Sequence, residues 1–361
     1  LSSNNLCPPY PTCFSDEEIG SQDTSECLEC SEGQISPDNQ SCYNQNDLDV
    51  LVAFAENSGL DSGYEDVINN LGNQTWNGYN HLEEWDCYNC DLSGSIPSEI
   101  GNFFDISSLN IGNNSLSGSI PSEIGNLTGI THLMLHDNDL IGSIPPEIGN
   151  LINLTYLSLS QNEFEGSIPI EIENLTNLTH LLLRQNDLTG SILPEIGSLV
   201  KLIQLDVASN NLTGPIPIEI GNLIDLLSIN FQDNNLSGSI PTEIVDLTDL
   251  VFLNLNINQI TGDIPPGIGD LSQLSELFLN NNNLTGPIPN SFCNLINNIN
   301  MDLSSNELCP AYPTCFTDEQ IGNQNTGGCP SCNVDEIGLY DDCYSQNDLD
   351  VLVKFAENSG M

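Results

Sequence analysis

Leucine and isoleucine recur along most of the chain with a period of 24 residues. In each period an L-x-L alternation stands before an asparagine, and this alternation predicts a short strand with its leucines on one buried face. The pattern x-L-x-G-x-I-P follows. The asparagine recurs in nine successive rungs, as Asn114, Asn138, Asn162, Asn186, Asn210, Asn234, Asn258, Asn282 and Asn306. A fixed period of this kind predicts a repeat architecture.

Each letter of the repeat has a physical role. The asparagine turns the chain out of the strand, and its side chain can bond backbone groups that the turn leaves unpaired. Glycine permits a backbone conformation that a Cβ atom would forbid. The Ile-Pro pair is expected to start an extended segment on the convex side, because proline fixes φ and donates no hydrogen bond. No rung can bury its own apolar face, so we expect a solenoid of stacked rungs.

At these positions the sequence resembles the plant-type subclass of the leucine-rich repeat family. The consensus L-x-x-L-x-L-x-x-N-x-L-x-G-x-I-P-x-E-I-G-N-L is matched almost letter for letter over residues 151–175. The resemblance implies an α/β fold, a curved right-handed coil with a parallel sheet on its concave side. This solenoid, with nine rungs, is expected over residues 91–306. Similar repeats occur in plant receptor ectodomains and in secreted proteins of marine bacteria.

The two ends of the chain are copies of one another. Residues 1–59 read LSSNNLCPPYPTCFSDEEIG … QNDLDVLVAFAENSG, and residues 303–360 repeat them with few changes. We therefore expect residues 1–45 to be a cysteine-rich cap or linker of a preceding block. Residues 307–361 are expected to be its second copy, which begins the next cap. The hypothesis that follows is a tandem array of blocks offset by 302 residues.

Residues 46–90 are expected to form an N-terminal cap. The segment that begins at Asp47 reads as a short amphipathic helix, which Gly59 ends. A W-x-C segment then reaches Cys87, and Cys90 stands in the register of the repeated asparagine. This arrangement resembles the plant-type cap, where a helix and a W-x-C strand seal the first rung. The matching C-terminal cap is expected to contain Cys293, Cys309 and Cys315.

Charge and cysteine content indicate an extracellular protein. With 51 acidic and 3 basic residues, the formal net charge is −48, which makes nucleic acid and anionic membranes poor partners. No run of 18 apolar residues is present, so no membrane insertion is expected. The 13 cysteines favour disulfides in an oxidising compartment, and three C-x-x-C pairs leave zinc as the alternative. The disulfide candidates are Cys7, Cys13, Cys27, Cys30, Cys42, Cys87, Cys90, Cys293, Cys309, Cys315, Cys329, Cys332 and Cys343.

One cluster on the expected concave face departs from its polar background of Asn, Ser, Asp and Gln. Adjacent rungs lie about 4.8 Å apart, so His132, Tyr156 and His180 are expected to form one stacked row. We interpret the cluster as a contact patch for a partner, and the alternative is polar variation on an exposed strand. No carboxylate–histidine spacing supports a metal site. The candidate binding residues are His132, His136, Tyr156, His180 and Arg184.

A column of glutamates is expected to stack on the convex side. Like charges at this spacing repel unless cations screen them. We interpret the column as a solvated ladder, and the alternative is a strip that binds divalent cations. No D-x-D-x-D-G calcium loop is present, so no cofactor is expected, with Ca²⁺ on the acidic surface as the alternative. The column consists of Glu99, Glu123, Glu147, Glu171, Glu195, Glu219 and Glu243.

Ten Asn-x-Ser/Thr sequons are glycosylation candidates, although several arise from the N-L-T of the repeat itself. In a eukaryotic source many would carry glycan, and in a bacterial source most would be bare. The candidates are Asn39, Asn73, Asn113, Asn126, Asn153, Asn174, Asn177, Asn211, Asn235 and Asn283.

No catalytic motif stands out from the repeat. The sequence lacks G-x-S-x-G, H-E-x-x-H and a phosphate-binding glycine-rich loop with lysine, so we expect no enzyme. The leading interpretation is an extracellular structural or adhesive protein, in which copies of the block form a filament or surface layer. The alternative is a receptor-type ectodomain that binds a protein or glycan ligand through its concave face. Ice binding needs a flat regular array, and the outward row containing Gly112, His136 and Arg184 is too irregular for it.

Overall fold

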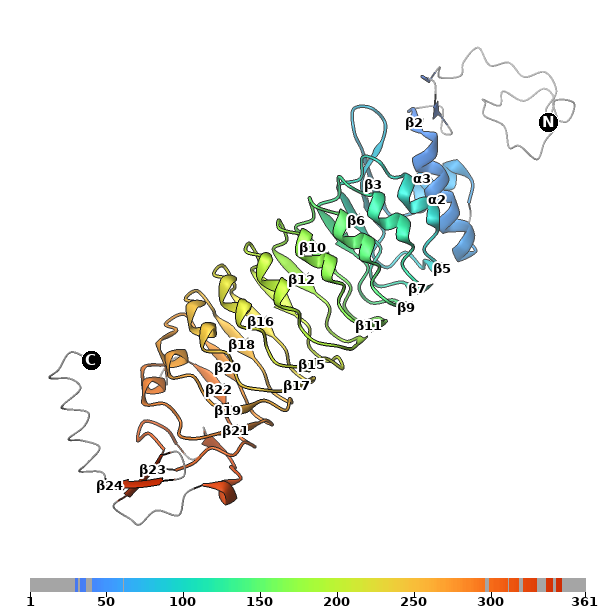
Figure 1. Cartoon of the computed structure of the whole chain (residues 1–361). Coiled ribbons are helices and arrows are strands. Elements are labelled where there is room, and N and C mark those ends of the chain that lie inside the picture. The colour runs from blue at the N-terminus through green and yellow to red at the C-terminus, as the bar shows by residue number, and fades with distance from the viewer. Residues whose placement is uncertain are drawn as a thin grey trace, which may run out of the picture. The chain divides into compact units, whose positions relative to one another are not determined.

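The computed structural model describes residues 30–31, 33–36, 41–60, 62–295, 299–310, 312–317, 321–329, 336–339 and 342–345. The chain forms two compact units, Leu1–His180 and Leu181–Met361. Both are built from one kind of rung, which has a short strand, a tight turn and one turn of 3-10 helix. Figure 1 shows the rungs of each unit stacked in order, with the helical turns along one side. The expected solenoid architecture is confirmed in each unit.

The main sheet of the first unit begins with an antiparallel hairpin and continues with parallel strands. The antiparallel β3 covers the edge of β4, which would otherwise present unpaired backbone groups. The strand order is β3 (Asn73–Trp76), β4 (Leu82–Asp86), β6 (Ser108–Asn110), β8 (His132–Met134) and β10 (Tyr156–Ser158). One further strand, β12 (His180–Leu182), spans the boundary of the two units.

The main sheet of the second unit is parallel. Each residue of a strand pairs with the residue 24 positions later in the next strand, as Leu205 does with Ile229. Its strands are β14 (Gln204–Asp206), β16 (Ser228–Asn230), β18 (Phe252–Asn254), β20 (Glu276–Phe278) and β22 (Asn300–Asp302). A second set of short strands follows the turns in both units. They are β5 (Ser93–Ser95), β7 (Ser115–Gly118), β9 (Asp139–Gly142), β11 (Glu163–Gly166), β13 (Asp187–Leu188), β15 (Thr213–Gly214), β17 (Asn235–Leu236), β19 (Thr261–Asp263) and β21 (Asn283–Thr285).

A short 3-10 helix follows the proline, or its counterpart Leu193, in every one of these rungs. Pro121 itself is extended, with φ −69° and ψ 148°, and the helix begins at the next residue. The prediction of an extended segment after Ile-Pro is therefore wrong. The fixed φ of proline also suits the residue that precedes a helical turn. The helices are η1 (Ser98–Asn102), η2 (Ser122–Asn126), η3 (Pro146–Asn150), η4 (Ile170–Asn174), η5 (Pro194–Ser198), η6 (Ile218–Asn222), η7 (Thr242–Asp246), η8 (Pro266–Asp270) and η9 (Asn290–Asn294).

The glutamate column lies on these helical turns, and glycine makes its stacking possible. A Cβ atom on Gly125 would lie 2.8 Å from the Cβ atom of Glu147 in the next rung. The same close approach relates Gly221 to Glu243, at 2.7 Å. Glycine at this position therefore lets successive helical turns pack closely.

The repeated asparagines form the predicted ladder. Asn210 is 7% exposed, and its Nδ2 donates to the carbonyl oxygens of Leu183 (3.0 Å), Val207 (3.0 Å) and Ala208 (3.2 Å). Its Oδ1 accepts from the N–H of Leu188 at 3.1 Å. One amide thus satisfies backbone groups of its own rung and of the rung before it. The ladder prediction is confirmed.

The cysteine-rich segment after Asn306 supplies one more ladder residue. Gln324 Nε2 donates to the carbonyl oxygens of Leu303 (2.9 Å) and Ile321 (2.8 Å). Its Oε1 accepts from the N–H of Leu308 at 3.3 Å. These bonds reproduce those of the asparagines, although Gln324 comes 18 residues after Asn306 instead of 24. The segment thereby closes the open end of the second unit's core.

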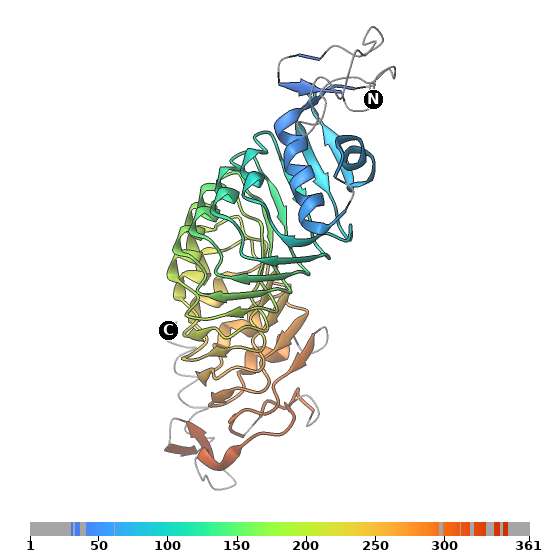
Figure 2. The ribbon, with the colours of Figure 1, turned by 90° about the vertical axis from the view of Figure 1, so that its right-hand side faces the viewer.

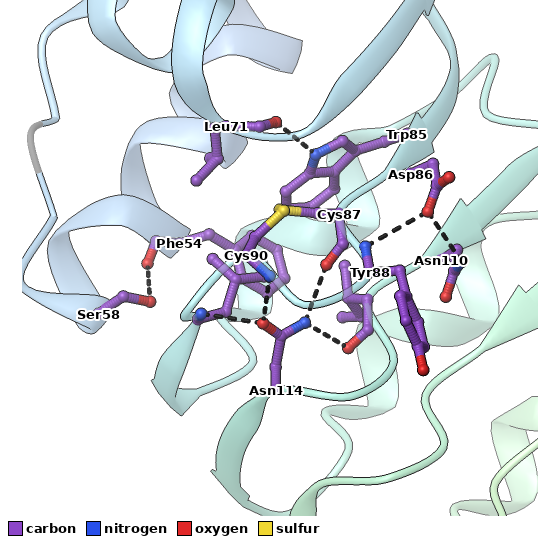
Figure 3. Close-up of a disulfide and its surroundings, with 12 residues drawn as sticks. Phe54, Ser58, Leu71, Trp85, Asp86, Cys87, Tyr88, Cys90, Asn110 and Asn114 are labelled. Atoms are coloured by element: carbon purple, nitrogen blue, oxygen red, sulfur yellow. Dashed lines mark hydrogen bonds between the residues drawn. A yellow bond between two sulfur atoms is a disulfide. The ribbon is translucent and has the colours of Figure 1, made fainter.

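In the first unit, helices cover the first rung. The predicted helix is confirmed as α2 (Gln45–Ser58), and it ends at Gly59 with φ 68°. Figure 2 shows α2 lying along the first strands of its unit, followed by the shorter α3 (Tyr64–Asn70). The Phe54 and Trp85 rings meet edge to face with centroids 5.0 Å apart. Trp85 Nε1 also donates to the carbonyl oxygen of Leu71 at 2.9 Å (Figure 3).

Within the described residues the cysteines form disulfides. Only one C-x-x-C pair, Cys87–Cys90, is joined internally (Figure 3). Cys30 and Cys329 belong to such motifs but pair elsewhere. The bonds are Cys30–Cys42, Cys87–Cys90, Cys293–Cys315 and Cys309–Cys329. The predicted disulfides are confirmed for these eight cysteines, and the side chains of the other five candidates lie outside the described part.

Three small elements complete the described chain. Two antiparallel hairpins join β1 (Gln34–Ile35) to β2 (Tyr43–Asn44) and β23 (Glu336–Leu339) to β24 (Asp342–Ser345). The 3-10 turn η10 (Thr326–Gly328) precedes Cys329. In the part of the chain that the structure describes, no helix is long and apolar enough to span a bilayer.

Replacement of Asn210 by alanine is expected to lower the free energy of unfolding by about 3 kcal/mol, because buried backbone groups lose their partners. The matched control is Asn211→Ala. Asn211 is exposed, and its side chain reaches only Asp187 Oδ1, at 3.5 Å, so a change below about 0.5 kcal/mol is expected. Urea unfolding followed by circular dichroism measures both, and equal losses would contradict the ladder account.

Candidate functional site

The predicted row of rings is present on the concave face of the first unit. His132 and Tyr156 are register partners on β8 and β10. Their ring centroids lie 6.1 Å apart with an interplanar angle of 20°. The Tyr156 and His180 rings follow with centroids 5.1 Å apart and an angle of 34°. The stacked geometry is confirmed, whereas the role of the row as a contact patch stays a prediction.

Threonine hydroxyls fix the tautomers of the two histidines. Thr131 Oγ1 lies 2.9 Å from the Ser107 carbonyl oxygen and 2.9 Å from His132 Nδ1. A carbonyl oxygen can only accept, so the threonine hydroxyl donates its one proton to Ser107. The second hydrogen bond therefore needs a proton on His132 Nδ1, which donates to the threonine oxygen. Thr179 holds His180 Nδ1 in the same way, at 2.9 Å. In the neutral form of each imidazole, Nε2 is therefore the hydrogen-bond acceptor.

A second pair of rings lies on the same face and includes a residue that the sequence analysis did not select. Tyr88 and His136 stand two rungs apart, yet their centroids are only 5.9 Å apart. Gly112 occupies the intervening position, where a Cβ atom would lie 2.7 Å from His136 Cε1. The absent side chain lets the two rings meet. The glycine at position 112, in a row whose neighbouring rungs carry side chains, is the sequence feature that could have predicted this contact.

Two polar atoms beside this ring pair lack a hydrogen-bond partner within the described residues. They are His136 Nδ1 and Ser160 Oγ, which belong to neighbouring rungs at equivalent positions. Ser160 is 6% exposed. A buried polar atom without a partner costs about 1–3 kcal/mol. The fold leaves both atoms unpaired at neighbouring outward positions.

Burial shifts the titration of the ring row. It raises the pKa of Tyr156, so this residue stays a neutral phenol. It lowers the pKa of His180 below its ordinary value of 6.5, and the proximity of His132 lowers it further. Tyr156 and His180 are therefore uncharged at neutral pH.

Arg184, the remaining candidate, belongs to the second unit. Its guanidinium donates to Gln185 Oε1 at 3.0 Å. Burial raises the pKa of the nearby Asp206, while the bond from the Ala208 N–H and the charge of Arg184 oppose that rise. The arginine thus interacts with its own unit, and its role in binding stays a prediction.

No group of three or more His, Cys, Asp or Glu side chains that could hold a metal ion occurs in the described ranges. A hollow at the C-terminal end of the second unit measures about 390 Å³ and is lined by polar residues that include Asn283, Asn323 and Asn325. Neither observation identifies a catalytic site.

Comparison with known proteins identifies the repeat. The family model described as Leucine Rich Repeat matches seven segments, residues 105–127, 129–151, 153–175, 177–199, 201–223, 249–271 and 273–295. No curated protein matches the chain. Among solved structures, the plant peptide hormone receptor RGFR1 in complex with RGF2 is 38% identical, with a TM-score of 0.63. The match covers 65% of this chain and 38% of that receptor.

A second similar structure is the Arabidopsis receptor kinase HAESA in complex with the peptide hormone IDA and the co-receptor SERK1. It is 29% identical with a TM-score of 0.66, and the match covers 73% of this chain and 46% of HAESA. A plant ice-binding protein is 25% identical with a TM-score of 0.56, and the match covers 76% of this chain and 99% of that one. The chain is a plant-type leucine-rich repeat protein. It spans less than half the length of the two receptor chains.

The leucine-rich repeat protein exposes most of its sequons. Asn39 lies outside the described residues, and Asn177 is half-buried, with its Nδ2 donating to the Ile152 carbonyl oxygen at 2.9 Å. The remaining candidates are exposed: Asn73, Asn113, Asn126, Asn153, Asn174, Asn211, Asn235 and Asn283. Glycan attachment at these positions stays a prediction, and none of them belongs to the ring row.

The His132→Gln variant is expected to raise the pKa of His180, because it removes the nearby charge while burial persists. NMR titration of the imidazole Cε1–H signals measures this. The matched control, His81→Gln in the N-terminal cap, should leave the His180 midpoint unchanged. An unchanged midpoint in His132→Gln would contradict the stacked geometry.

The lowered pKa also has a consequence for stability. The folded-state pKa of His180 lies below the unfolded value, so its contribution to stability is complete above pH ~6.5 and is lost as the pH falls through the folded-state pKa.

Proposed function

We propose that this leucine-rich repeat protein is a non-enzymatic, extracellular binding domain. Its ligand is an extended segment of a partner protein or peptide, held on the concave face of the first unit. The observation that carries the proposal is the pair of ring clusters, His132–Tyr156–His180 and Tyr88–His136, beside polar atoms that the fold leaves unpaired.

The chemistry of this face suits a peptide. The rings offer flat apolar contact area with polar ends, a combination enriched at protein interfaces. The Nε2 atoms of His132 and His180 offer acceptors to backbone N–H groups or to side-chain donors, in line with the bonds that Thr131 and Thr179 make. Met134 lies between the two clusters on β8 and is half-buried, and its flexible side chain can adapt to a ligand.

The similar receptor structures support this proposal. RGFR1 was solved with RGF2, and HAESA was solved with the peptide hormone IDA. Because the present chain spans only 38% and 46% of those two chains, their complete activities and partners do not transfer. What carries over is the proposal that a solenoid of this kind holds a peptide.

The extracellular assignment rests on the disulfides. Structural disulfides persist in oxidising compartments, and each unit carries two of them in its cap region, Cys30–Cys42 and Cys87–Cys90 in the first, Cys293–Cys315 and Cys309–Cys329 in the second. The acidic surface also suits a secreted protein that has to stay soluble.

The filament hypothesis ranks behind binding. The duplication of residues 1–59 in residues 303–360 favours a tandem array whose partners are copies of the same chain. The similar receptor structures give that hypothesis no support. Ice binding also ranks behind, despite the similar ice-binding protein, because the outward positions Tyr88, Gly112, His136 and Ser160 differ in size and polarity from rung to rung.

Selection of a phage-displayed library of random twelve-residue peptides on the full chain tests the proposal. We expect enriched peptides whose affinity falls about tenfold in Tyr156→Ala and in His180→Ala, the size of effect typical of a central interface residue. Gln204→Ala, at the equivalent strand position in the second unit, is the matched control and should bind normally. Isothermal titration calorimetry measures each affinity.

Two results would contradict the proposal. One is the absence of any enriched peptide. The other is a set of enriched peptides that bind Tyr156→Ala and His180→Ala as tightly as the unmodified chain, since the binding would then lie elsewhere.

A further inference from the structure

The concave face of the second unit carries a second group of rings, formed by Phe252 on β18 and Phe278 on β20. Both are half-buried, and their centroids lie 6.2 Å apart at an angle of 60°. Phenylalanine at these outward strand positions exposes apolar surface that smaller or polar side chains would not. The two rings lie diagonally across the neighbouring strands β18 and β20, because the residue directly opposite Phe252 is Glu276.

Two carboxylates lie next to these rings. Glu276 and Phe278 are two residues apart on β20, so both project from the same face of the sheet. Asp302 on β22 is the register partner of Phe278. No hydrogen bond or ion pair of the Glu276 carboxylate occurs among the residues that the structure describes, whereas Asp302 Oδ1 accepts from the Ser304 N–H at 2.9 Å. Two rings and two negative charges therefore share one small area.

Unpaired acceptors border the same area. Asn256 Oδ1 and Asn280 Oδ1 are buried and make no hydrogen bond within the described part of the chain. They occupy equivalent positions in the rungs that carry Phe252 and Phe278. The Glu276 carboxylate is half-buried and makes no hydrogen bond among the described residues, so a ligand that matches this acceptor must supply donors.

Ile257 adds a strained, exposed apolar residue to the rung of Phe252. Its φ is 53°, and it is 43% exposed. A β-branched residue rarely adopts a left-handed conformation. The equivalent positions in the neighbouring rungs carry Asp233 and Asn281, which tolerate it. The turn imposes this conformation at the equivalent position of every rung, so Ile257 keeps an exposed apolar side chain at a backbone cost.

We infer that Phe252, Glu276, Phe278 and Asp302 form a second binding site, which takes a lysine or arginine side chain of a peptide. The cation sits against the phenylalanine rings and between the carboxylates, an arrangement that combines cation–π and charge–charge attraction. The half-buried Asn256 and Asn280 side chains border the bound peptide. This site is independent of the ring row of the first unit and does not need the proposed function to hold.

The probe is a twelve-residue peptide of glycine and serine that carries one leucine and two lysines, compared with the same peptide acetylated on both lysines. We expect the lysine peptide to bind the full chain saturably, and acetylation to weaken binding about tenfold, because it removes the charge. Fluorescence anisotropy with a labelled peptide measures both. Tyr156→Ala should bind the probe normally, which separates this site from the first unit's face.

The variants are chosen to distinguish this site from general attraction to an acidic surface. Phe252→Ala and Phe278→Ala leave the net charge unchanged and are expected to weaken binding about tenfold each. Phe252→Leu and Phe278→Leu keep apolar volume without the ring, and serve if the alanine variants fold poorly. Glu276→Gln should weaken binding about fivefold, whereas Glu219→Gln on the convex side, with the same change in charge, should have less than a twofold effect.

Three results would overturn the inference. One is normal binding of the lysine peptide to the phenylalanine variants. Another is an equal loss in Glu219→Gln and Glu276→Gln, which would mean general attraction. The third is saturable binding of cellohexaose, lost in the phenylalanine variants, without binding of the lysine peptide, which would assign the face to a glycan.

Discussion

The buried amide of the repeated asparagine is the interaction on which the rest of the structure depends. Each tight turn leaves backbone donors and acceptors inside the solenoid, where water cannot reach them. The asparagine side chain offers two donors and one acceptor oxygen, and in Asn210 all of them serve backbone groups. Because the bonds cross from rung to rung, each rung is stable only beside its neighbours.

Because of this constraint, each rung contains positions whose residue type the fold requires and positions whose residue type can vary. Leucine, asparagine, glycine and proline fill the positions that face inward or form the turns, and these repeat with little change. The outward positions of the short strands are not needed for the ladder or the core. They can therefore carry His132, Tyr156 and His180 in one unit and Phe252 and Phe278 in the other, and these are the positions where binding chemistry is proposed.

Much of this follows from sequence, and the exceptions have physical reasons. The period of 24 predicts the ladder, the solenoid and the ring row, because register is exact when every rung has one length. It fails at Gln324, where a shorter segment and a longer side chain fulfil the ladder's role. The contact between Tyr88 and His136 depends on an absent side chain at Gly112, and disulfide pairing depends on how the caps fold back. None of these is encoded by periodicity.

The central claim is that the ladder stabilises the fold while the ring row is free to bind. The most direct measurement is urea unfolding of the triple variant His132→Gln/Tyr156→Gln/His180→Gln, since Gln204 shows that this strand position accepts glutamine. The account predicts a loss of no more than about 1.5 kcal/mol in the free energy of unfolding for the whole row. A loss above about 3 kcal/mol, as expected for removal of one ladder asparagine, would contradict it and make the row part of the structural packing.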